Sequence, residues 1–361
     1  MNAGGLLGYC RAGFEPELAA ELTQRAAEAG QAGYAVAERG MGHVAFMAED
    51  PAALSRALPW RSLVFARQKL QLLATLEGLD PADRISPILA VLGNARFGEL
   101  VVEHPDSDVH KPLAGLARAF GNALRPALRK AGILGPKDDT HHPRLHVCLV
   151  AGDRLFLASG DPGDSAPWPM GVPRLRLHRD APSRSALKLE EAFLVMLDAD
   201  ERARLLRPGM HAADLGAAPG GWTWVLVREG LEVSAIDNGP LRQHVMDSGR
   251  VQHLREDGFR WQPPRPLDWM VCDMVEQPRR VASRMAAWFR EGWCRNAVFN
   301  LKLPMKKRWV ETQTCMQLFA SEAGLPLDVR AHQLYHDREE ITVVALRPSR
   351  NRTAATPIQP T

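Results

Sequence analysis

The sequence predicts an α/β protein in which a mostly parallel sheet, covered by helices on both faces, follows an amino-terminal α+β region. The first of three observations is length, because 361 residues are more than one hydrophobic core usually serves. The second is a stretch at 160–182 that is rich in glycine, proline, aspartate and arginine, which is typical of a domain junction. The third is the alternation of short apolar strands with helical patterns after that stretch.

The composition is that of an ordinary globular protein. Hydrophobic residues make up 45% and charged residues 24%, which excludes disorder for most of the chain. The net charge of +3 is too small to indicate a nucleic-acid partner by itself. Five cysteines without CxxC spacing argue against a disulfide framework and favour the reducing cytoplasm. Because we find neither a membrane-length apolar run nor an export signal, we expect no membrane partner.

The amino-terminal half is predicted to hold two small α+β regions, at residues 1–60 and 61–165. In the first, the pattern predicts strands at 6–9 and 44–47 around a helix at 15–29. In the second, it predicts an apolar stretch at 63–72, helices at 82–92 and 112–130, and a strand at 99–103. The last of these helices carries Arg118, Arg125 and Arg129 on one flank.

The carboxy-terminal half follows a predicted linker at 166–182. It is expected to form one domain at 183–350 and to end in a frayed tail at 351–361. Its predicted helices lie at 185–197 and 222–228, and its predicted strands at 212–215, 232–236, 269–272, 297–301 and 341–346.

The strongest local signal is AADLGAAPGGWTWVL, an apolar strand followed by a turn of small residues and a helix. Glycines allow a backbone to pass close to a ligand at the carboxyl end of the first strand. The GxGxxG pattern of dinucleotide-binding proteins is absent, which favours a ligand without a pyrophosphate. The predicted cofactor-binding turn comprises Gly216, Ala218, Pro219, Gly220 and Gly221.

Two acids after this turn extend the pattern. Asp237 ends the next predicted strand, where a carboxylate can accept hydrogen bonds from both ribose hydroxyls. Asp257 follows a predicted third strand and can accept from the exocyclic amine of an adenine. Together the turn and the acids predict S-adenosylmethionine rather than NAD. The structural alternative is that the glycines only close a tight turn and that both acids are solvated.

The run DLGAAPGGWT closely resembles the cofactor loop of the FtsJ/RrmJ-like ribose 2'-O-methyltransferases, which are Rossmann-like enzymes dependent on S-adenosylmethionine. The resemblance implies a catalytic tetrad whose members here are Lys188, Asp273, Lys302 and Glu340. Glu339 competes with Glu340 for the last role. The resemblance also implies that Ser185 contacts the cofactor, with a helix N-cap as the alternative, and that Asp273 borders the cofactor.

The chain as a whole, including LPWRSLVFARQ, resembles the RlmM family of bacterial 23S ribosomal RNA cytidine 2'-O-ribose methyltransferases. This resemblance implies a ferredoxin-like α+β subdomain at 1–60 and a THUMP RNA-binding domain at 61–165. It also implies 23S ribosomal RNA as the partner. No obligate protein partner is evident, and we expect a monomer.

Within the tetrad, Lys302 is the expected general base for a ribose hydroxyl. An amine serves as a base only when its pKa falls toward neutrality, which requires burial or a nearby cation. The end of the apolar run AVFNL is expected to bury Lys302, and Lys188 is the expected second cation. Basic clusters at 279–284 and 306–308 flank this site and are expected to contact RNA phosphates, the alternative being solvated helix faces.

Two other readings compete with an RNA methyltransferase. One is a non-catalytic RNA-binding or ribosome-assembly module, which has no need of two lysines and two acids at strand ends. The other is a nicotinamide-dependent oxidoreductase, which the absent GxGxxG disfavours. We expect no metal site, because His141, His142 and His146 lack a carboxylate or cysteine at ligand spacing. Trp222 and Trp224 are expected to pack in the core rather than to stack on bases.

Overall fold

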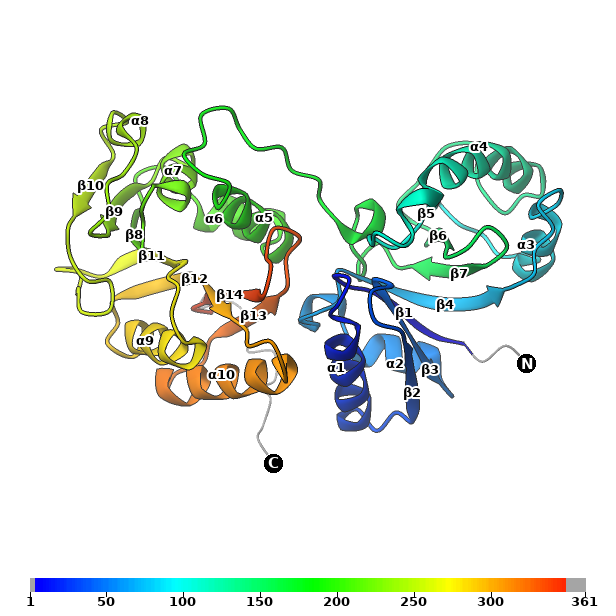
Figure 1. Cartoon of the computed structure of the whole chain (residues 1–361), viewed down its shortest axis with the longest axis horizontal. Coiled ribbons are helices and arrows are strands. Elements are labelled where there is room, and N and C mark those ends of the chain that lie inside the picture. Colours follow the sequence, from blue (N-terminus) through cyan, green and yellow to red (C-terminus); the bar gives the residue numbers. More distant parts are fainter. Residues whose placement is uncertain (1–3, 349–361) are drawn as a thin grey trace. The chain divides into compact units, whose positions relative to one another are not determined.

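The computed structural model describes residues 4–348, so the predicted tail at 351–361 lies outside the described residues. The chain divides into two compact units, residues 1–173 and 174–361 (Figure 1). Each unit is built on its own seven-stranded sheet. The point of division falls within the stretch 166–182, and Ala166 still belongs to the first unit because it bonds to Gln68 there.

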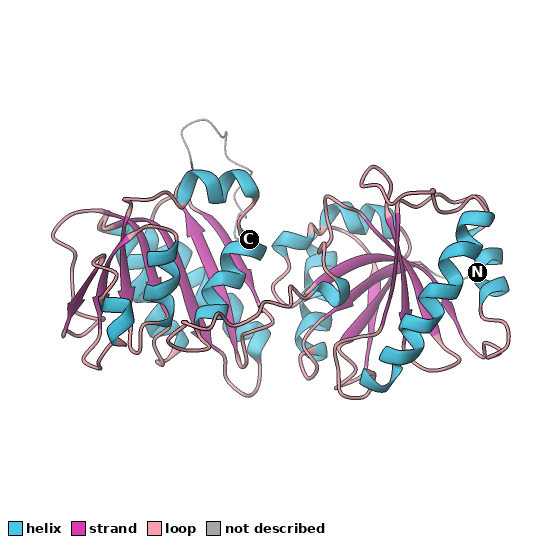
Figure 2. Ribbon diagram, turned by 90° about the horizontal axis from the view of Figure 1, so that it is seen from above, coloured by secondary structure: helices cyan, strands magenta, loops and turns pink. Residues whose placement is uncertain are grey.

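The sheet of the amino-terminal unit has the order β2-β3-β1-β4-β7-β6-β5. All its strand pairs are antiparallel except the parallel pair β5 and β6, and the strands twist strongly across the sheet (Figure 2). The strands are β1 (Gly5–Tyr9), β2 (Gly33–Ala37), β3 (His43–Ala48), β4 (Gln68–Leu76), β5 (Glu99–Glu103), β6 (Arg144–Leu149) and β7 (Leu155–Gly160). The helices are α1 (Glu15–Glu28), α2 (Pro51–Ala57), α3 (Ile85–Leu92) and α4 (Ala114–Lys130).

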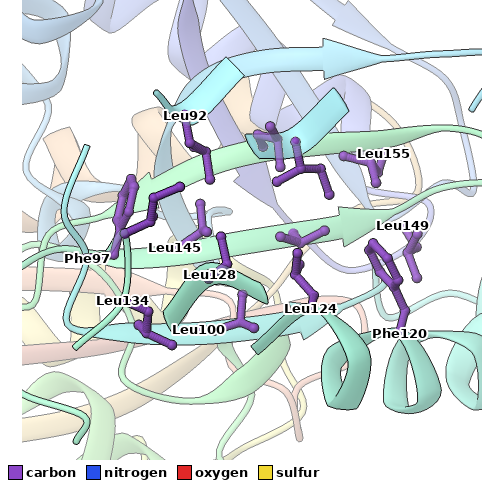
Figure 3. Close-up of a cluster of buried hydrophobic side chains, with 14 of the residues drawn as sticks. Leu92, Phe97, Leu100, Phe120, Leu124, Leu128, Leu134, Leu145, Leu149 and Leu155 are labelled. Carbon is purple, nitrogen blue, oxygen red and sulfur yellow. The ribbon is translucent and has the colours of Figure 1, made fainter. Parts of the chain in front are cut away.

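Helix α4 is amphipathic and packs its apolar stripe on the β5–β7 part of this sheet (Figure 3). Phe120, Leu124 and Leu128 recur every four residues and are buried, as the helical spacing predicts. They meet Leu100 and Leu145 from the strands. Burying each such side chain contributes about 1.5–3 kcal/mol, so this stripe holds the helix on the sheet.

The carboxy-terminal unit is a Rossmann-like α/β domain with the sheet order β10-β9-β8-β11-β12-β14-β13. Its strands are β8 (His211–Leu215), β9 (Glu232–Ile236), β10 (Val251–Leu254), β11 (Leu267–Cys272), β12 (Cys294–Lys302), β13 (Asp328–His332) and β14 (Glu340–Leu346). The five strands β10, β9, β8, β11 and β12 run parallel, and β14 is antiparallel to both of its neighbours. The mostly parallel sheet predicted from the sequence is confirmed.

Helices cover both faces of this sheet (Figures 1 and 2). One face carries α5 (Ala186–Met196), α6 (Ala199–Leu205) and α7 (Gly221–Arg228); the other carries α9 (Pro278–Arg290) and α10 (Arg308–Ala323), while the short α8 (Gln243–Met246) adjoins β10. Because helices cover both faces, the central strands are shielded from solvent, and β11 and β12 consist almost wholly of buried residues. Polar groups at their ends are therefore placed by a rigid apolar core.

The strand predictions were incomplete. The apolar stretch at 63–72 becomes a strand only from Gln68, because residues 63–66 are buried without ladder partners after a single 3-10 turn. Strands β2 and β13 were not predicted, because β2 is exposed and β13 is short and polar. Within residues 4–348, no helix is long and apolar enough to cross a bilayer. All five cysteines are buried with free thiols.

Candidate active site

The candidate site lies where the carboxyl ends of the parallel strands meet. Strands β11 and β12 end at Cys272 and Lys302, so Asp273 and Lys302 lie at one edge of the sheet. Strand β14 runs the other way, and its first residue, Glu340, lies directly opposite Lys302. Lys188 reaches the same edge from α5. Residues more than 150 positions apart in sequence thus converge because of strand order and direction.

The four side chains form one ion-pair cluster, called here the Lys–Asp–Lys–Glu cluster (Lys188, Asp273, Lys302, Glu340). Lys188 Nζ donates to Asp273 Oδ2 at 3.1 Å and lies 2.5 Å from Glu340 Oε1. Lys302 Nζ donates to Asp273 Oδ1 at 3.2 Å and also to Glu340 Oε2. Each carboxylate therefore bridges both ammonium groups, which fixes the two amines next to each other.

The two lysines differ in their surroundings. The side chain of Lys188 is 15% exposed and that of Lys302 is 28% exposed, so Lys302 is less buried than the apolar run before it predicted. Lys302 lies at the open end of its strand, where the sheet core no longer covers it. Burial alone would lower the pKa of Lys188, but Asp273 and Glu340 outweigh it and raise that pKa. Lys188 accordingly keeps its proton.

The choice between Glu339 and Glu340 follows from the strand pairing. Glu340 is 4% exposed and contacts both lysines. Glu339 instead accepts a hydrogen bond from Arg308 at 2.6 Å. Glu339 precedes β14, and its side chain is directed to Arg308 rather than to Lys302.

The turn after β8 packs so closely against the rest of the unit that no side chain would fit at Gly216 or Gly221. Gly216 has φ +79°, and a Cβ there would lie 2.6 Å from Met274 Cγ. A Cβ on Gly221, at the start of α7, would lie 2.3 Å from Ser185 Oγ. The Ala218–Pro219 peptide between them is cis. The strand, turn and helix predicted from the motif are all present, at 211–215, 216–220 and 221–228.

Asp237 is tied to this turn. Its Oδ2 accepts from the Ala218 amide at 2.9 Å and its Oδ1 accepts from the Gly239 amide at 2.7 Å. A carboxylate has further lone pairs to offer, so it can still accept from ribose hydroxyls. Asp257 lies after β10 as predicted, is exposed, and accepts from the Phe259 amide at 2.8 Å. This donor and acceptor set fits an adenosine-containing cofactor.

Ser185 occupies the N-cap position of α5, but its side chain makes no capping hydrogen bond. Its hydroxyl lies 2.7 Å from the Ser183 hydroxyl, and its carbonyl oxygen accepts from Trp222 Nε1 at 3.0 Å. Trp222 and Trp224 are 3% and 7% exposed, which confirms core packing. Trp222 therefore joins the start of α5 to the turn after β8.

Much of the predicted RNA-facing charge is already paired within the protein. Arg279 bonds to both carboxylate oxygens of Glu311, and Arg280 pairs with Glu276. Arg284 donates to the Trp261 carbonyl oxygen and lies over two tryptophan rings. Arg308 is buried and holds Glu339, whereas Lys306 and Lys307 are exposed.

The arginines on one flank of α4 are also partly bonded within the protein. Arg125 donates to the Leu100 carbonyl oxygen at 2.9 Å and to Asp138, and Arg129 donates to the Gly135 carbonyl oxygen. Arg118 and Lys130 are exposed. Among the histidines, His146 is buried beside Glu103 at 2.7 Å, while His141 and His142 are exposed. No metal-binding group of three side chains occurs among the residues that the structure describes.

The structure adds four polar residues that the motif analysis missed. Asp214, at the end of β8, is buried and accepts from Thr223 at 2.6 Å, and burial raises its pKa to about 7. Asn300 donates to Asp273, and behind it lie Thr342 and Asp337. Asn300 was accessible to sequence reasoning, because it lies two residues before Lys302 and so shares its face of β12.

Comparison with protein-family models places three matches along the chain. Residues 3–70 match the RlmM ferredoxin-like domain, and residues 83–160 match the amino-terminal model of ribosomal RNA large subunit methyltransferase M. Residues 181–308 match the FtsJ-like methyltransferase model. That last match contains the glycine turn and three members of the Lys–Asp–Lys–Glu cluster, while Glu340 lies beyond it.

Curated relatives match over nearly the whole chain. Ribosomal RNA large subunit methyltransferase M of Xanthomonas axonopodis pv. citri is 66% identical over 344 residues, covering 95% of this chain and 99% of that protein. The protein of the same name from Stenotrophomonas maltophilia is 68% identical over 342 residues, covering 94% and 96%. A solved structure with remote similarity is TrmN from Thermus thermophilus, at 16% identity and a TM-score of 0.36, covering 95% of this chain and all of that one. From the curated matches, together with the glycine turn and the FtsJ-like model, the chain belongs to the RlmM family of S-adenosylmethionine-dependent methyltransferases.

Proposed function

We propose that this enzyme methylates the ribose 2'-hydroxyl of a cytidine in 23S ribosomal RNA, with Lys302 as general base. The carrying observation is that Lys188 and Lys302 share both carboxylates, Asp273 and Glu340, at the sheet edge that also bears the glycine turn. The names of the relatives specify large-subunit ribosomal RNA. That substrate fits the cytoplasmic location expected from the free cysteines.

The cofactor end of the site is assigned to the turn at 216–221, with Asp237 on the ribose hydroxyls, Asp257 on the adenine edge, and Ser185 and Asp273 at its border. S-adenosylmethionine supplies an electrophilic methyl group on a sulfonium. Because the close packing at Gly216 and Gly221 fixes the turn, its backbone is preorganised for binding. Asp237 fixes the same turn through the Ala218 amide.

The catalytic end is assigned to the Lys–Asp–Lys–Glu cluster. A ribose hydroxyl is a poor nucleophile until its proton is removed. Lys302 has the more exposed of the two lysine side chains, so it is the one assigned to meet an incoming hydroxyl. Lys188 stays charged between the same two carboxylates, so a second cation lies beside Lys302. Lys302, as the neutral amine, would take the hydroxyl proton, and S-adenosylhomocysteine would be the leaving group when the oxygen receives the methyl group.

RNA capture is assigned to the amino-terminal unit, as the resemblance to THUMP-containing enzymes implies. Arg118 and Lys130 on α4 are its exposed candidates, together with Lys306 and Lys307 beside the catalytic cluster. A protein lacking residues 1–173 should still bind S-adenosylhomocysteine, because the second unit has its own sheet and core. Its RNA affinity and methylation rate should fall. Full activity of that shortened protein would place RNA capture elsewhere.

Lys302→Met tests the role of the base. Methionine keeps an unbranched apolar side chain and removes the amine, so cofactor and RNA affinity should survive while the rate falls by about 100- to 10,000-fold. Lys306→Met is the matched control, because Lys306 is an exposed lysine four residues away. It should retain the rate at saturating RNA. Near wild-type turnover of Lys302→Met would remove Lys302 from the mechanism.

The acceptor atom and nucleotide need a separate test. RNA carrying a 2'-deoxycytidine at the target position should accept no methyl group. In a strain lacking the enzyme, mapping of ribose methylation across ribosomal RNA should show the loss of one 2'-O-methylcytidine in 23S RNA. Loss of a base methylation instead would contradict the proposed 2'-hydroxyl acceptor while leaving the methyltransferase assignment intact.

A further inference from the structure

Behind the Lys–Asp–Lys–Glu cluster, hydrogen bonds connect Asp273 to a buried carboxyl group. Asn300 Nδ2 donates to Asp273 Oδ1 at 2.8 Å. Thr342 Oγ1 lies 2.8 Å from Asn300 Oδ1, and it lies 3.0 Å from Asp337 Oδ2 and 3.3 Å from Asp337 Oδ1. Asn300, Thr342 and Asp337 are each completely buried. We call these three residues the buried relay; it ends on the carboxylate that both lysines share.

Strand register places the buried relay. In the antiparallel pair β12 and β14, Asn300 lies opposite Thr342, just as Lys302 lies opposite Glu340. Residues two apart on a strand share a face, so the two pairs are neighbours on one side of the sheet. Asp337 comes from the loop that precedes β14, where its Oδ2 accepts from the Leu334 amide at 3.0 Å.

The number of protons in the relay constrains its chemistry. A threonine hydroxyl carries one proton. Because Asn300 directs its NH2 group to Asp273, the oxygen that it presents to Thr342 can only accept. An ionised Asp337 can also only accept. Thr342 would then face two acceptors with a single proton, and an unsatisfied oxygen contact in a dry interior costs free energy.

The charges around Asp337 act in the same direction. Burial, followed by the carboxylates of Glu340 and Glu191, raises the pKa of Asp337 well above its usual range, and Lys188 opposes this only in part. Glu191 is bound by the His336 side chain at 2.6 Å. His332 is the other titratable group near the relay, as the cross-strand partner of Thr342 on β13.

We propose that Asp337 is a protonated positioning residue, which donates to Thr342 so that Thr342 donates to Asn300 and Asn300 orients Asp273. The proton stays on Asp337 throughout, and no bond to carbon forms or breaks there. The consequence for catalysis rests on the proposed function, because Asp273 matters through the two lysines. The protonation of Asp337 does not rest on it.

The activity test compares neutral and apolar replacements. Asp337→Asn keeps an acceptor at the Oδ2 position for the Leu334 amide and places a donor at the Oδ1 position, 3.3 Å from Thr342 Oγ1. Its rate and pH profile should therefore match those of the unaltered enzyme. Asp337→Leu and Thr342→Val break the relay and should lower the single-turnover rate by up to about 100-fold with unchanged affinity for S-adenosylhomocysteine. Thr342→Ser, which keeps the hydroxyl, should restore most of the rate. Loss of activity in Asp337→Asn equal to that in Asp337→Leu would overturn the proposal.

A spectroscopic test needs no turnover. The infrared difference spectrum between the unaltered enzyme and Asp337→Asn at neutral pH should contain the carbonyl stretch of a protonated carboxylic acid, which shifts in deuterium oxide. A carboxylate band in its place would show that Asp337 is ionised and would refute the proposal. If Lys302→Met stays fully active, the proposed catalytic role of the cluster fails, yet this infrared result still decides the state of Asp337.

Discussion

Lys302, the last residue of β12, lies directly opposite Glu340, the first residue of β14, and an ion pair joins their side chains. The same Glu340 carboxylate also contacts Lys188 from α5. An antiparallel strand at this position turns its starting residue toward the carboxyl ends of the parallel strands. The acid is therefore contributed by the beginning of a strand, whereas Asp273 and Lys302 come from strand ends.

Replacing Glu340 by glutamine should lower the rate of methyl transfer by about 100-fold or more, because the two amines lose a carboxylate that holds them both. The matched control is Glu339→Gln, whose carboxylate faces Arg308 instead. That variant should keep its rate and lose only a little stability. The measurement is single-turnover methylation of RNA at saturating cofactor. Equal rates for the two variants would contradict the assignment of Glu340.

Asp237→Ala should weaken the binding of S-adenosylhomocysteine by about 1.5–3 kcal/mol, the range for hydrogen bonds to a charged group. Part of that loss should come from the turn itself, since Asp237 also holds the Ala218 and Gly239 amides. Isothermal titration calorimetry measures the change. Glu256→Ala, at an exposed neighbouring acid, serves as the control and should bind normally. Unchanged affinity in Asp237→Ala would remove Asp237 from the cofactor site.

Asp214→Asn should change the pH dependence of stability. The folded pKa of Asp214 is about 7, against roughly 3.9 when unfolded, so its protonated form stabilises the native state fully below pH about 4. That contribution, up to roughly 4 kcal/mol, is lost as pH rises through 7. The amide cannot ionise. In urea unfolding, the free energy of unfolding of Asp214→Asn should therefore rise relative to that of the unaltered protein between pH 5 and 8. A constant difference across that range would show that Asp214 is not protonated in the fold.

Arg118→Ala and Arg125→Ala should separate RNA contact from structural support on α4. Arg118 is exposed, so its loss should weaken RNA binding and reduce the salt slope by about 1 if it contacts a phosphate. Arg125 is bonded to Leu100 and Asp138, so its loss should instead cost about 1 kcal/mol of unfolding free energy. Salt titrations of RNA binding and urea unfolding measure the two effects. An unaffected salt slope in Arg118→Ala would exclude that contact.

The sequence predicted those parts of the molecule that depend on local pattern. Helix α4 was predicted from the spacing of its apolar residues, and the turn at 216–221 was predicted from small residues between a strand and a helix. The structure contains both. Asp237 was found because it ends a predicted strand of the parallel sheet, whereas Asp273 came from the resemblance to the FtsJ-like enzymes. The burial of Lys302 was overestimated, since an apolar run predicts where a strand lies but not how far its last side chain extends from the core.

Features that depend on pairing between distant segments could not be read in this way. Asp337 is an ordinary loop aspartate in sequence, and only the register of β12 against β14 places Thr342 between it and Asn300. Likewise, nothing local shows that Arg125 and Arg279 are already engaged by Asp138 and Glu311. Long-range ion pairs reduce the positive charge that is available to bind RNA, and the amino-acid composition does not show which charges are paired.

Strand β4 has a mechanical consequence for the amino-terminal unit. It is hydrogen-bonded to β1 along one edge and to β7 along the other, and Gln71 and Leu72 are paired on both sides. A strand shared in this manner cannot serve as a hinge, and a load applied to one half of the sheet passes directly to the other. The two halves of the sheet should therefore move as one rigid body when RNA binds. The amides of β4 should exchange with solvent only when the entire unit unfolds.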